Sequence, residues 1–303
     1  MGQPQRYAHP SGIRAVTLGQ RVFVCLQYLV PQILLTRIAG AFARRRIPLL
    51  TPFVIRRFIR AYGVDMAEAV EPDPATYPTF NAFFTRPLRA HARPLAPAPA
   101  LLCPCDGTVS EAGSLDGGRL LQAKGIHYSA VDLLGDGELA DRYAGGTFAT
   151  IYLAPSDYHR VHMPAAGALE RMGYLPGRLF SVNPATVAGR PGLFARNERL
   201  VANFRGAGSS FAMVLVGAMI VGGIRTPWSG RVTPRSAEPW RILTDTQLFY
   251  ERGREMGTFE LGSTVIILFP PARVTLAADL LPGRKVRMGE AIGDVREADE
   301  PLH

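Results

Sequence analysis

Hydrophobic and polar positions divide the chain into a helical N-terminal part and a strand-rich remainder. Residues 21–46 carry an apolar stretch that predicts one or two helices, and residues 53–62 predict another. One stripe of this second helix, at the spacing i, i+3, i+4 and i+7, is formed by Ile55, Phe58, Ile59 and Tyr62. Later in the chain, short apolar runs between turn residues predict strands at 118–123, 147–153, 211–217, 219–224, 230–234 and 264–269.

The run from 259 to 270 has the clearest strand pattern. It contains a continuous apolar stretch, rich in β-branched and aromatic residues, that ends at Pro270. Gly262 precedes this stretch and can adopt backbone conformations closed to other residues. We therefore expect a buried strand entered through a tight corner at Gly262-Ser263, where Ser263 is either a simple turn residue or a reactive hydroxyl.

Three other segments complete the predicted architecture. Residues 65–100 are rich in Pro and Ala and predict a linker that wraps the body. A helix is expected at 129–143, with Ser129 as its N-cap. The segment 285–295 alternates in polarity and turns at Met288-Gly289, which predicts a hairpin.

Positive charge is concentrated at the N-terminus. Residues 1–64 contain ten Arg and no Asp or Glu, so the net charge of +9 leaves −1 for residues 65–303. A basic arm suits an anionic surface, either phospholipid or nucleic acid. Nucleic acid is disfavoured because Lys is nearly absent and no base-reading pattern occurs. The predicted fold class is α+β, with amphipathic, membrane-associating helices at 1–64 followed by a β-rich catalytic body at 65–303.

The sequence offers no helix long enough to span a bilayer. The most apolar stretch, 22–35, has 14 residues and is interrupted by Gln27, Pro31 and Gln32, whereas a span needs about 20 apolar residues. The helix at 53–62 is open to two interpretations. It is either a surface helix packed on the core, or an interfacial helix with its apolar face in the acyl boundary and its arginines among lipid phosphates.

The cysteines indicate little chemistry. Cys25, Cys103 and Cys105 are odd in number, and Cys103-Pro-Cys105 lacks the spacing of a zinc knuckle or a thioredoxin motif. We interpret all three as reduced thiols of a cytosolic protein and expect no metal site.

Three segments carry candidate catalytic residues. These are Asp106 in CDGTV, then Asp157, His159 and His162 in YLAPSDYHRVHMP, and finally Gly262-Ser263. Taken singly, each is explained as a turn or as a loop with solvated imidazoles. Together they supply the carboxylate, imidazole and hydroxyl of a charge-relay nucleophile. The sequence does not show that the three meet in space. A metal is disfavoured because no further ligand set completes the His-x-x-His pair.

Eight motifs follow one another along the chain. They are FNAFFTRPL (80–88), DGTV (106–109), KGIHYS (124–129), YLAPSDYHRVHMP (152–164), GRLFSVNP (177–184), LFARNERL (193–200), LVGAMIVGGI (215–224) and LGSTVIILF (261–269). In this order they resemble the phosphatidylserine decarboxylases in their bacterial proenzyme form. The resemblance covers about residues 78 to 295, and DYHRVH and LGST are its most specific motifs.

The resemblance implies that the chain cleaves itself. Ser263 would attack the carbonyl of Gly262 to give an ester, and elimination followed by hydrolysis would release ammonia. A pyruvoyl group would then begin a small chain, 263–303, beside a large chain, 1–262. This group would form a Schiff base with the amine of phosphatidylserine and accept the electrons left by CO2. Because it is made from Ser263, no separately bound cofactor is expected.

The resemblance also implies roles for the other candidates. Asp106 and His162 would form the relay that activates Ser263. His159 would act with the substrate, as proton donor to the carbanion, and Asp157 would support the loop that carries both histidines. Two other classes remain as alternatives. One is a serine hydrolase that uses Asp106, His162 and Ser263 on an external ester, and the other is a non-enzymatic membrane-binding protein.

A bilayer-held substrate would bring the protein to a membrane. We expect a peripheral protein on the cytoplasmic face of the cell membrane, docked on anionic lipid through residues 21–62. Each Arg near an anionic leaflet contributes about 1 kcal/mol to such attachment. The partners expected are phosphatidylserine in the membrane and the two chains of one precursor, with no nucleic acid. The oligomeric state stays open, a homodimer included.

Overall fold

The computed structural model describes most of the chain. The described residues are 19, 27, 31–123, 125–206, 210–219, 223–232, 241–242, 248–260 and 263–296. Two residues singled out above, Cys25 and Gly262, lie outside them. So do residues 220–222 and 233–234, which belong to two of the expected strands.

Along the described residues, helices and strands each occur in runs. The helices are α2 (Gln32–Ala43), α3 (Leu50–Tyr62), α4 (Phe80–Phe84), α5 (Ala130–Leu134), α6 (Gly137–Tyr143), α7 (Pro184–Gly189) and α8 (Leu193–Arg196). The strands are β1 (Ala100–Leu102), β2 (Gly107–Ser114), β3 (Arg119–Ala123), β4 (Ile126–Ser129), β5 (Thr147–Leu153), β6 (Arg160–His162), β7 (Gly167–Leu175), β8 (Arg199–Arg205), β9 (Ser210–Val216), β10 (Ile224–Thr226), β11 (Gly230–Arg231), β12 (Arg241–Ile242), β13 (Phe249–Tyr250), β14 (Glu255–Phe259), β15 (Ser263–Phe269), β16 (Val274–Leu276), β17 (Lys285–Val286) and β18 (Ala291–Val295).

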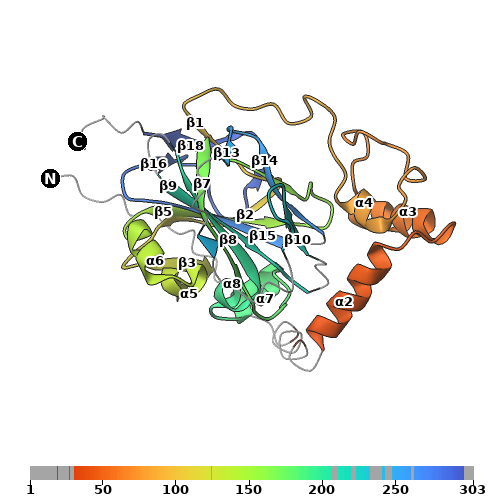
Figure 1. Cartoon of the computed structure of the whole chain (residues 1–303), viewed down its shortest axis with the longest axis horizontal. Coiled ribbons are helices and arrows are strands. Elements are labelled where there is room, and N and C mark those ends of the chain that lie inside the picture. The colour runs from red at the N-terminus through yellow and green to blue at the C-terminus, as the bar shows by residue number, and fades with distance from the viewer. Residues whose placement is uncertain are drawn as a thin grey trace.

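A nine-stranded antiparallel sheet forms the centre of the body (Figure 1). Its order is β12-β7-β8-β9-β15-β5-β2-β17, and β13 also pairs with β7. Smaller sheets have the orders β11-β10-β14-β6, β1-β18-β16 and β3-β4. The predicted α+β class with a β-rich body is confirmed. β3, β5, β9 and β15 confirm four of the expected strands.

β15 is a central strand because both of its faces are apolar. All seven of its residues are buried between β9 and β5. Val265, Ile267 and Phe269 point into a core shared with the small sheets, whereas Ile266 and Leu268 point into a core covered by α5–α8. A strand with alternate residues in two cores reads as a continuous apolar run, as the sequence predicted.

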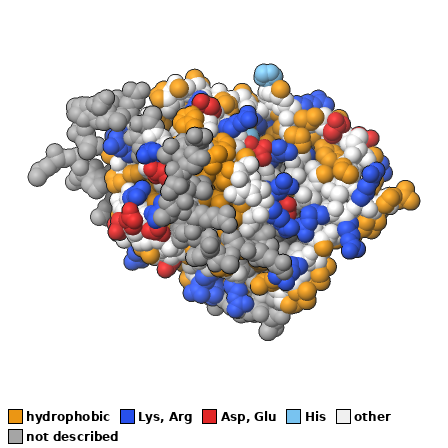
Figure 2. Space-filling model, viewed as in Figure 1, with side chains coloured by type: hydrophobic (Ala, Val, Ile, Leu, Met, Phe, Trp, Pro, Cys, Tyr) orange, Lys and Arg blue, Asp and Glu red, His pale blue; other side chains and the backbone are white. Residues whose placement is uncertain are grey.

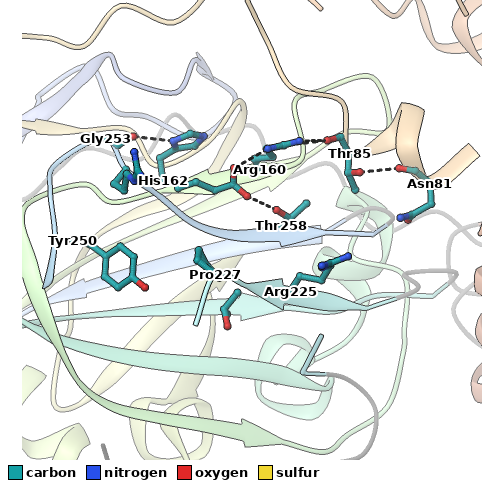
Figure 3. A pocket seen from close by; sticks show the side chains of 12 residues that line it. Asn81, Thr85, Arg160, His162, Arg225, Pro227, Tyr250, Gly253 and Thr258 are labelled. Atoms are coloured by element: carbon teal, nitrogen blue, oxygen red, sulfur yellow. Dashed lines mark hydrogen bonds and ion pairs between the residues drawn. The ribbon is translucent and has the colours of Figure 1, made fainter. Parts of the chain in front are cut away.

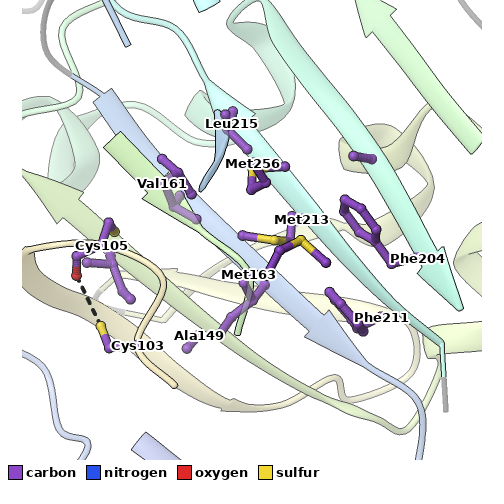
Figure 4. Packing of buried hydrophobic residues seen from close by; sticks show 14 of the residues in the cluster. Cys103, Cys105, Ala149, Val161, Met163, Phe204, Phe211, Met213, Leu215 and Met256 are labelled. Atoms are coloured by element: carbon purple, nitrogen blue, oxygen red, sulfur yellow. Dashed lines mark hydrogen bonds between the residues drawn. The ribbon is translucent and has the colours of Figure 1, made fainter. Parts of the chain in front are cut away.

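The core between the large sheet and the small sheets brings distant parts of the chain together. Figure 4 shows Val161 of β6 and Met256 of β14 beside Met213 and Leu215 of β9. All four side chains are fully buried. The short strands that carry the candidate histidines are therefore fixed against the large sheet by apolar packing.

The helix expected at 129–143 is two helices. Ser129 caps α5 as predicted, its hydroxyl accepting from the backbone. Gly135 then adopts a left-handed conformation with φ of 71° and ends α5. Asp136 caps a new helix, α6. The single-helix prediction was wrong because Gly135 ends one helix and Asp136 begins the next.

The hairpin expected at 285–295 is not formed. β17 pairs with β2 in the large sheet, whereas β18 lies between β1 and β16 in another sheet. Gly289, at a positive φ of 89°, turns the chain, and its amide donates to the carbonyl of Cys103. The turn was correctly located, but it carries the chain from one sheet to the next.

α2, α3 and α4 gather at one end of the molecule (Figure 1). The predicted stripe of α3 lies partly against α4: Ile55 is fully buried, and the ring of Phe58 meets those of Phe83 and Phe84 edge-on. Tyr62 is 51% exposed. This packing favours the surface-helix interpretation for α3. Among the described residues, no helix is both long and apolar enough to cross a bilayer.

α2 has the opposite arrangement. Its buried residues are small or polar, namely Gln32, Thr36, Gly40 and Ala43. Its exposed residues include large apolar ones, namely Ile33, Leu34, Leu35, Ile38 and Phe42. In Figure 2, hydrophobic side chains and Lys or Arg side chains lie side by side over the end of the molecule that Figure 1 assigns to α2 and α3.

Candidate active site

Three adjacent strands bring the candidate segments to one edge of the large sheet. Ser263, the first residue of β15, pairs with Leu153, the last residue of β5. On the other side of β5, Thr108 of β2 pairs with Tyr152. The residues before β2, those after β5 and Ser263 at the start of β15 therefore meet at this edge, because the register of the two ladders fixes them there. Asp106 comes just before β2, and the histidine loop comes just after β5.

Ser263 is completely buried, and its hydroxyl is unsatisfied. Its exposed fraction is 0%, and among the described residues its Oγ has no hydrogen-bond partner. The neighbouring Thr264 hydroxyl is also without a partner. Buried polar groups are nearly always paired, and an unpaired one costs free energy. Such a hydroxyl at a strand entry is a candidate for chemistry.

His162 is held in one tautomer. Its Nδ1 lies 2.9 Å from the carbonyl oxygen of Gly253, and its Nε2 lies 3.1 Å from the Tyr158 hydroxyl. Because a carbonyl can only accept, Nδ1 carries the proton and Nε2 accepts from Tyr158. Burial lowers the pKa of His162, while the negative charge of Asp106 acts in the opposite sense. The imidazole is thus a neutral base with an oriented lone pair.

Asp106 is bound by an arginine rather than by His162. The Nε of Arg93 lies 2.9 Å and 3.1 Å from the two carboxylate oxygens, and the amide of Met288 donates to one of them at 2.9 Å. The His162 amide donates to Pro104, two residues before Asp106. The predicted carboxylate and imidazole are therefore neighbours, but they share no hydrogen bond.

His159 is the more deeply buried histidine, with an exposed fraction of 0%. Its ring stacks on Phe84, with 4.0 Å between the centroids. Neither ring nitrogen has a partner in hydrogen-bonding geometry among the described residues. Burial, reinforced by the charge of Arg86, lowers the pKa of His159 to about 3. The ring is consequently neutral at physiological pH.

Asp157 shapes the loop between β5 and β6. Its carboxylate accepts from the amide of Ala154 at 2.6 Å, and its own amide donates back to the Ala154 carbonyl at 2.9 Å. Burial raises the pKa of Asp157. Within the described part of the chain, no group of three or more His, Cys, Asp or Glu side chains is placed to hold a metal ion.

A pocket of about 850 Å³ opens beside His162 (Figure 3). It is bounded by α4 and by the strands β6, β10 and β14. Arg160 crosses its wall, ion-paired with Glu255 at 2.9 Å and bonded to the carbonyl of Thr85. Arg225 and Arg254 also line it and make no ion pair with the described residues. The excess of positive charge suits an anionic ligand. Ser263 and His159 are not part of this lining.

Sequence reasoning missed three residues of this site. Tyr158 and Gly253 bind the ring of His162, and Arg93 binds Asp106. Tyr158 was visible, since it stands inside the motif four residues before His162. Gly253 and Arg93 come from distant segments, and no local pattern connects them to the motif.

Comparison with known proteins shows the family of the chain. A family model described as phosphatidylserine decarboxylase matches residues 80–294, and a second one, described as PSD, matches residues 22–63. The first match covers more than half of the chain and includes every candidate site residue. The chain therefore belongs to the phosphatidylserine decarboxylase family.

Relatives from several bacteria agree with this assignment. The protein of Methylibium petroleiphilum is 53% identical over 279 residues, which cover 91% of this chain and 98% of that protein. That of Polaromonas naphthalenivorans is 50% identical, covering 92% and 98%. That of Azoarcus sp. is 51% identical, covering 92% and 97%. Each is named phosphatidylserine decarboxylase proenzyme.

Proposed function

We propose that the chain is a self-processing enzyme that decarboxylates phosphatidylserine to phosphatidylethanolamine. Membership of the family and the names of the relatives support this reaction. The observation that carries the proposal is the environment of Ser263. It places a buried, unsatisfied hydroxyl at the entry of the central strand, directly after Gly262.

The first reaction breaks the bond between Gly262 and Ser263. The Oγ of Ser263 attacks the carbonyl carbon of Gly262, the amide nitrogen leaves, and an ester forms. Loss of the Ser263 Cα proton then expels the Gly262 carboxylate and leaves dehydroalanine. Water converts this residue to a pyruvoyl group and ammonia. The products are the chains 1–262 and 263–303.

His162 is assigned as the base in this cleavage. Its Nε2 lone pair, which now accepts from Tyr158, is the group that takes the Ser263 proton. The Asp106 carboxylate favours the imidazolium that results, since its charge raises the pKa of His162 even without a direct bond. For a direct relay, Asp106 would have to leave Arg93.

The surroundings of Ser263 suit a pyruvoyl group built at this position. Among the described residues, the hydroxyl has no partner that its conversion would orphan. Such a group accepts the electron pair left by CO2, as pyridoxal phosphate does in other decarboxylases. His159 is assigned to return a proton to the substrate carbon. Its buried ring is neutral, so it has to take up a proton before it donates one, and neither ring nitrogen has a partner among the described residues. Asp157 supports the loop that leads to His159 and His162.

α2 is proposed to dock the enzyme on the cytoplasmic face of the membrane. It turns Ile33, Ile38 and Phe42 outward while small and polar residues face the protein. Exposed arginines follow it at Arg45 and Arg46. This arrangement fits insertion of the apolar side among acyl chains, with guanidinium groups at the lipid phosphates.

Intact mass of the purified protein tests the proposal. We expect two fragments divided at 262/263, the smaller one lacking a free α-amine. Ser263→Ala should give one uncleaved chain without decarboxylase activity. Thr264→Val is the matched control, because it removes the adjacent unsatisfied hydroxyl and should leave cleavage intact. An active, uncleaved chain labelled at Ser263 by a serine-directed electrophile would favour a hydrolase instead.

The two histidines separate the two reactions. His162→Ala should block cleavage, whereas His159→Ala should cleave and decarboxylate poorly. The measurements are the fraction of cleaved chain on a denaturing gel and CO2 release per cleaved chain. A His159→Ala protein that stays uncleaved would overturn this division of roles.

A further inference from the structure

Arg86, two residues beyond α4, is a buried cation with unused donors. Its exposed fraction is 3%. Its Nη2 donates to the carbonyl of Ser156 at 3.2 Å, and its guanidinium lies over the ring of Phe83 at 5.3 Å from the centroid. Its Nε and Nη1 have no partner among the described residues. A buried charge is normally paired, so these two donors call for a partner.

The unused donors belong to the same edge of the sheet as Ser263. Ser156 and His159 lie on the loop that follows Leu153, and Leu153 pairs with Ser263. Phe84, two residues before Arg86, stacks on His159. Two donors of a guanidinium, both nitrogens of an imidazole and a hydroxyl, all buried and without a partner among the described residues, therefore belong to segments that meet at one loop.

The nearby carboxylates do not satisfy Arg86. Asp106 and Glu68 act on it only through their charge, because both are hydrogen-bonded to Arg93. Asp157 is bonded to the amide of Ala154. What Arg86 lacks is an anion that enters from outside, and a planar guanidinium with two free donors suits the oxygens of a phosphate or carboxylate.

We propose that Arg86 binds the phosphodiester of the lipid head group. This inference rests on the proposed function, whose substrate carries two anions, a carboxylate and a phosphodiester. A cation on the carboxylate would stabilise a charge that disappears as CO2 leaves, and so would raise the barrier. A cation on the phosphodiester binds the ground state and the transition state alike. The phosphodiester is therefore the anion assigned to Arg86.

The pocket beside His162 gives this site an approach. Thr85 and Arg160 line the pocket, and they are the chain neighbours of Arg86 and His159. The carbonyl of Thr85 accepts two bonds from Arg160 and so ties the segment that carries Arg86 to the strand that follows His159. Asn81, one turn earlier in α4, also lines the pocket. The pocket is therefore lined by residues directly next to Arg86 and His159 in the chain.

Arg86→Met tests the assignment, because it removes the charge and keeps the length of the side chain. We expect normal self-cleavage and a KM for phosphatidylserine in mixed micelles that rises about 10- to 100-fold, the range of a lost hydrogen bond to a charged group, with kcat changed less than twofold. Arg86→Lys keeps the charge without the planar fork and should lie between. Arg89→Met is the matched control, since Arg89 is exposed three residues further on and its side chain donates to the Ala69 carbonyl as its one hydrogen bond to the described residues.

Inhibition by phosphatidylethanolamine identifies which anion Arg86 holds. The product keeps the phosphodiester and lacks the carboxylate. We expect its inhibition constant to rise in Arg86→Met by the same factor as KM. A raised KM with unchanged product inhibition would assign Arg86 to the carboxylate and overturn the inference.

Other outcomes decide as well. An unchanged KM in a cleaved Arg86→Met protein, or a folded variant of unchanged Tm that fails to cleave, would overturn the inference. If Arg86→Met does not fold, Arg86→Lys decides by the same two constants. Failure of the proposed function looks different, because the unaltered protein would then release no CO2 from phosphatidylserine.

Discussion

β15 and α2 use their hydrophobic residues in opposite ways. Every residue of β15 is buried, with alternate side chains in two cores. α2 instead buries Gln32 and other small or polar residues, and exposes Ile33 and Ile38 by 50% and 57%. The body thus follows the rule for a protein in water, and α2 follows the reverse rule. The reversal leaves large apolar side chains exposed on the outer side of α2, which is the observation behind the proposed docking to a membrane.

The way α2 is attached supports this contrast. The side chain of Gln32 accepts from the amide of Leu179 at 3.0 Å and donates to the carbonyl of Gln27 at 2.8 Å. Gln27 in turn accepts from the amide of Ser181 at 2.8 Å. Buried amide side chains therefore hold this region to the body, and its large apolar side chains remain exposed.

The largest expected difference between the two regions is the loss of stability when one isoleucine in each is truncated. Ile267 of β15 is fully buried, and Ile267→Ala should lower the free energy of unfolding by about 2–5 kcal/mol, because it removes apolar contact and leaves a cavity. Ile38→Ala in α2 should change it by less than about 0.5 kcal/mol. Urea denaturation in detergent-free buffer measures both, and equal losses would contradict the comparison.

Binding to lipid vesicles should show the opposite order for the same two variants, with Ile38→Ala affected and Ile267→Ala not. Binding to vesicles that contain phosphatidylserine should weaken by up to about 50-fold in Ile38→Ala, because three carbon groups are removed and each contributes about 0.8 kcal/mol when buried. Folded Ile267→Ala protein should bind as the unaltered protein does. Val131→Ala, at another exposed position on the body (46%, against 57% for Ile38), is the control for loss of a surface apolar side chain. A Val131 variant as impaired as Ile38→Ala would remove the special role of α2.

Sequence patterns predicted these elements with uneven success, for physical reasons. The apolar run of β15 and the stripe of α3 are local signals, and both elements formed where expected. The reversal of α2 was not predictable, since a pattern gives the faces of a helix but not which face meets protein. The hairpin after Lys285 failed because pairing of β17 with β2 depends on distant residues.

The site shows the same limit. The motifs supplied Asp106, His162 and Ser263 as candidates, but they did not show that the three meet. The pairing of β2, β5 and β15 brings Asp106 and Ser263 to one edge of the large sheet, and His162 ends the neighbouring strand β6. The partners that set their present states, Arg93 on Asp106 and Gly253 on His162, are side-chain and backbone contacts over long sequence separations. A single sequence contains no periodic signal for such contacts.

The next prediction concerns a buried acid of the body, Glu111, and the pH dependence of the free energy of unfolding. Burial raises the pKa of Glu111 from 4.5 to about 7. Between these values the folded chain binds more protons at this site than the unfolded chain, so the free energy of unfolding falls as pH rises through this window. Glu111→Gln should therefore be more stable than the unaltered protein at pH 8, by about 1–3 kcal/mol at 1.4 kcal/mol per pKa unit. Below the unfolded pKa the gain should vanish.

Urea denaturation at the two ends of that window checks this prediction. Glu138→Gln is the control, because the Glu138 side chain is 72% exposed and its ion pairs, with Arg142 of α6 and Arg171 of β7, are at the surface. It should show no comparable gain at pH 8. A Glu111→Gln protein with the same pH dependence as the unaltered chain would show that Glu111 titrates as an exposed carboxylate.

The smallest expected effect concerns the contact that joins the two regions. Arg44, just after α2, reaches Glu260 at 3.3 Å, and Arg231 of the body reaches the same carboxylate oxygen at 3.2 Å. Glu260 is buried and stands three residues before Ser263. Because Arg44 is partly exposed, its pair is worth about 0.2–1 kcal/mol. Arg44→Ala should therefore slow self-cleavage about 1.5- to 5-fold, if the arm steadies the segment that leads to the cleavage site.

Arg45→Ala isolates this contact from the charge of the arm. It removes the same charge from an exposed neighbour that makes no ion pair with the described residues. Both variants should lose vesicle affinity alike, whereas only Arg44→Ala should cleave more slowly, as followed on a denaturing gel during synthesis in vitro. Equal cleavage rates would mean that α2 and β15 differ in what they contact yet do not influence each other. Slower cleavage in Arg44→Ala alone would show that the region of α2 acts on the strand that begins with Ser263 through Glu260.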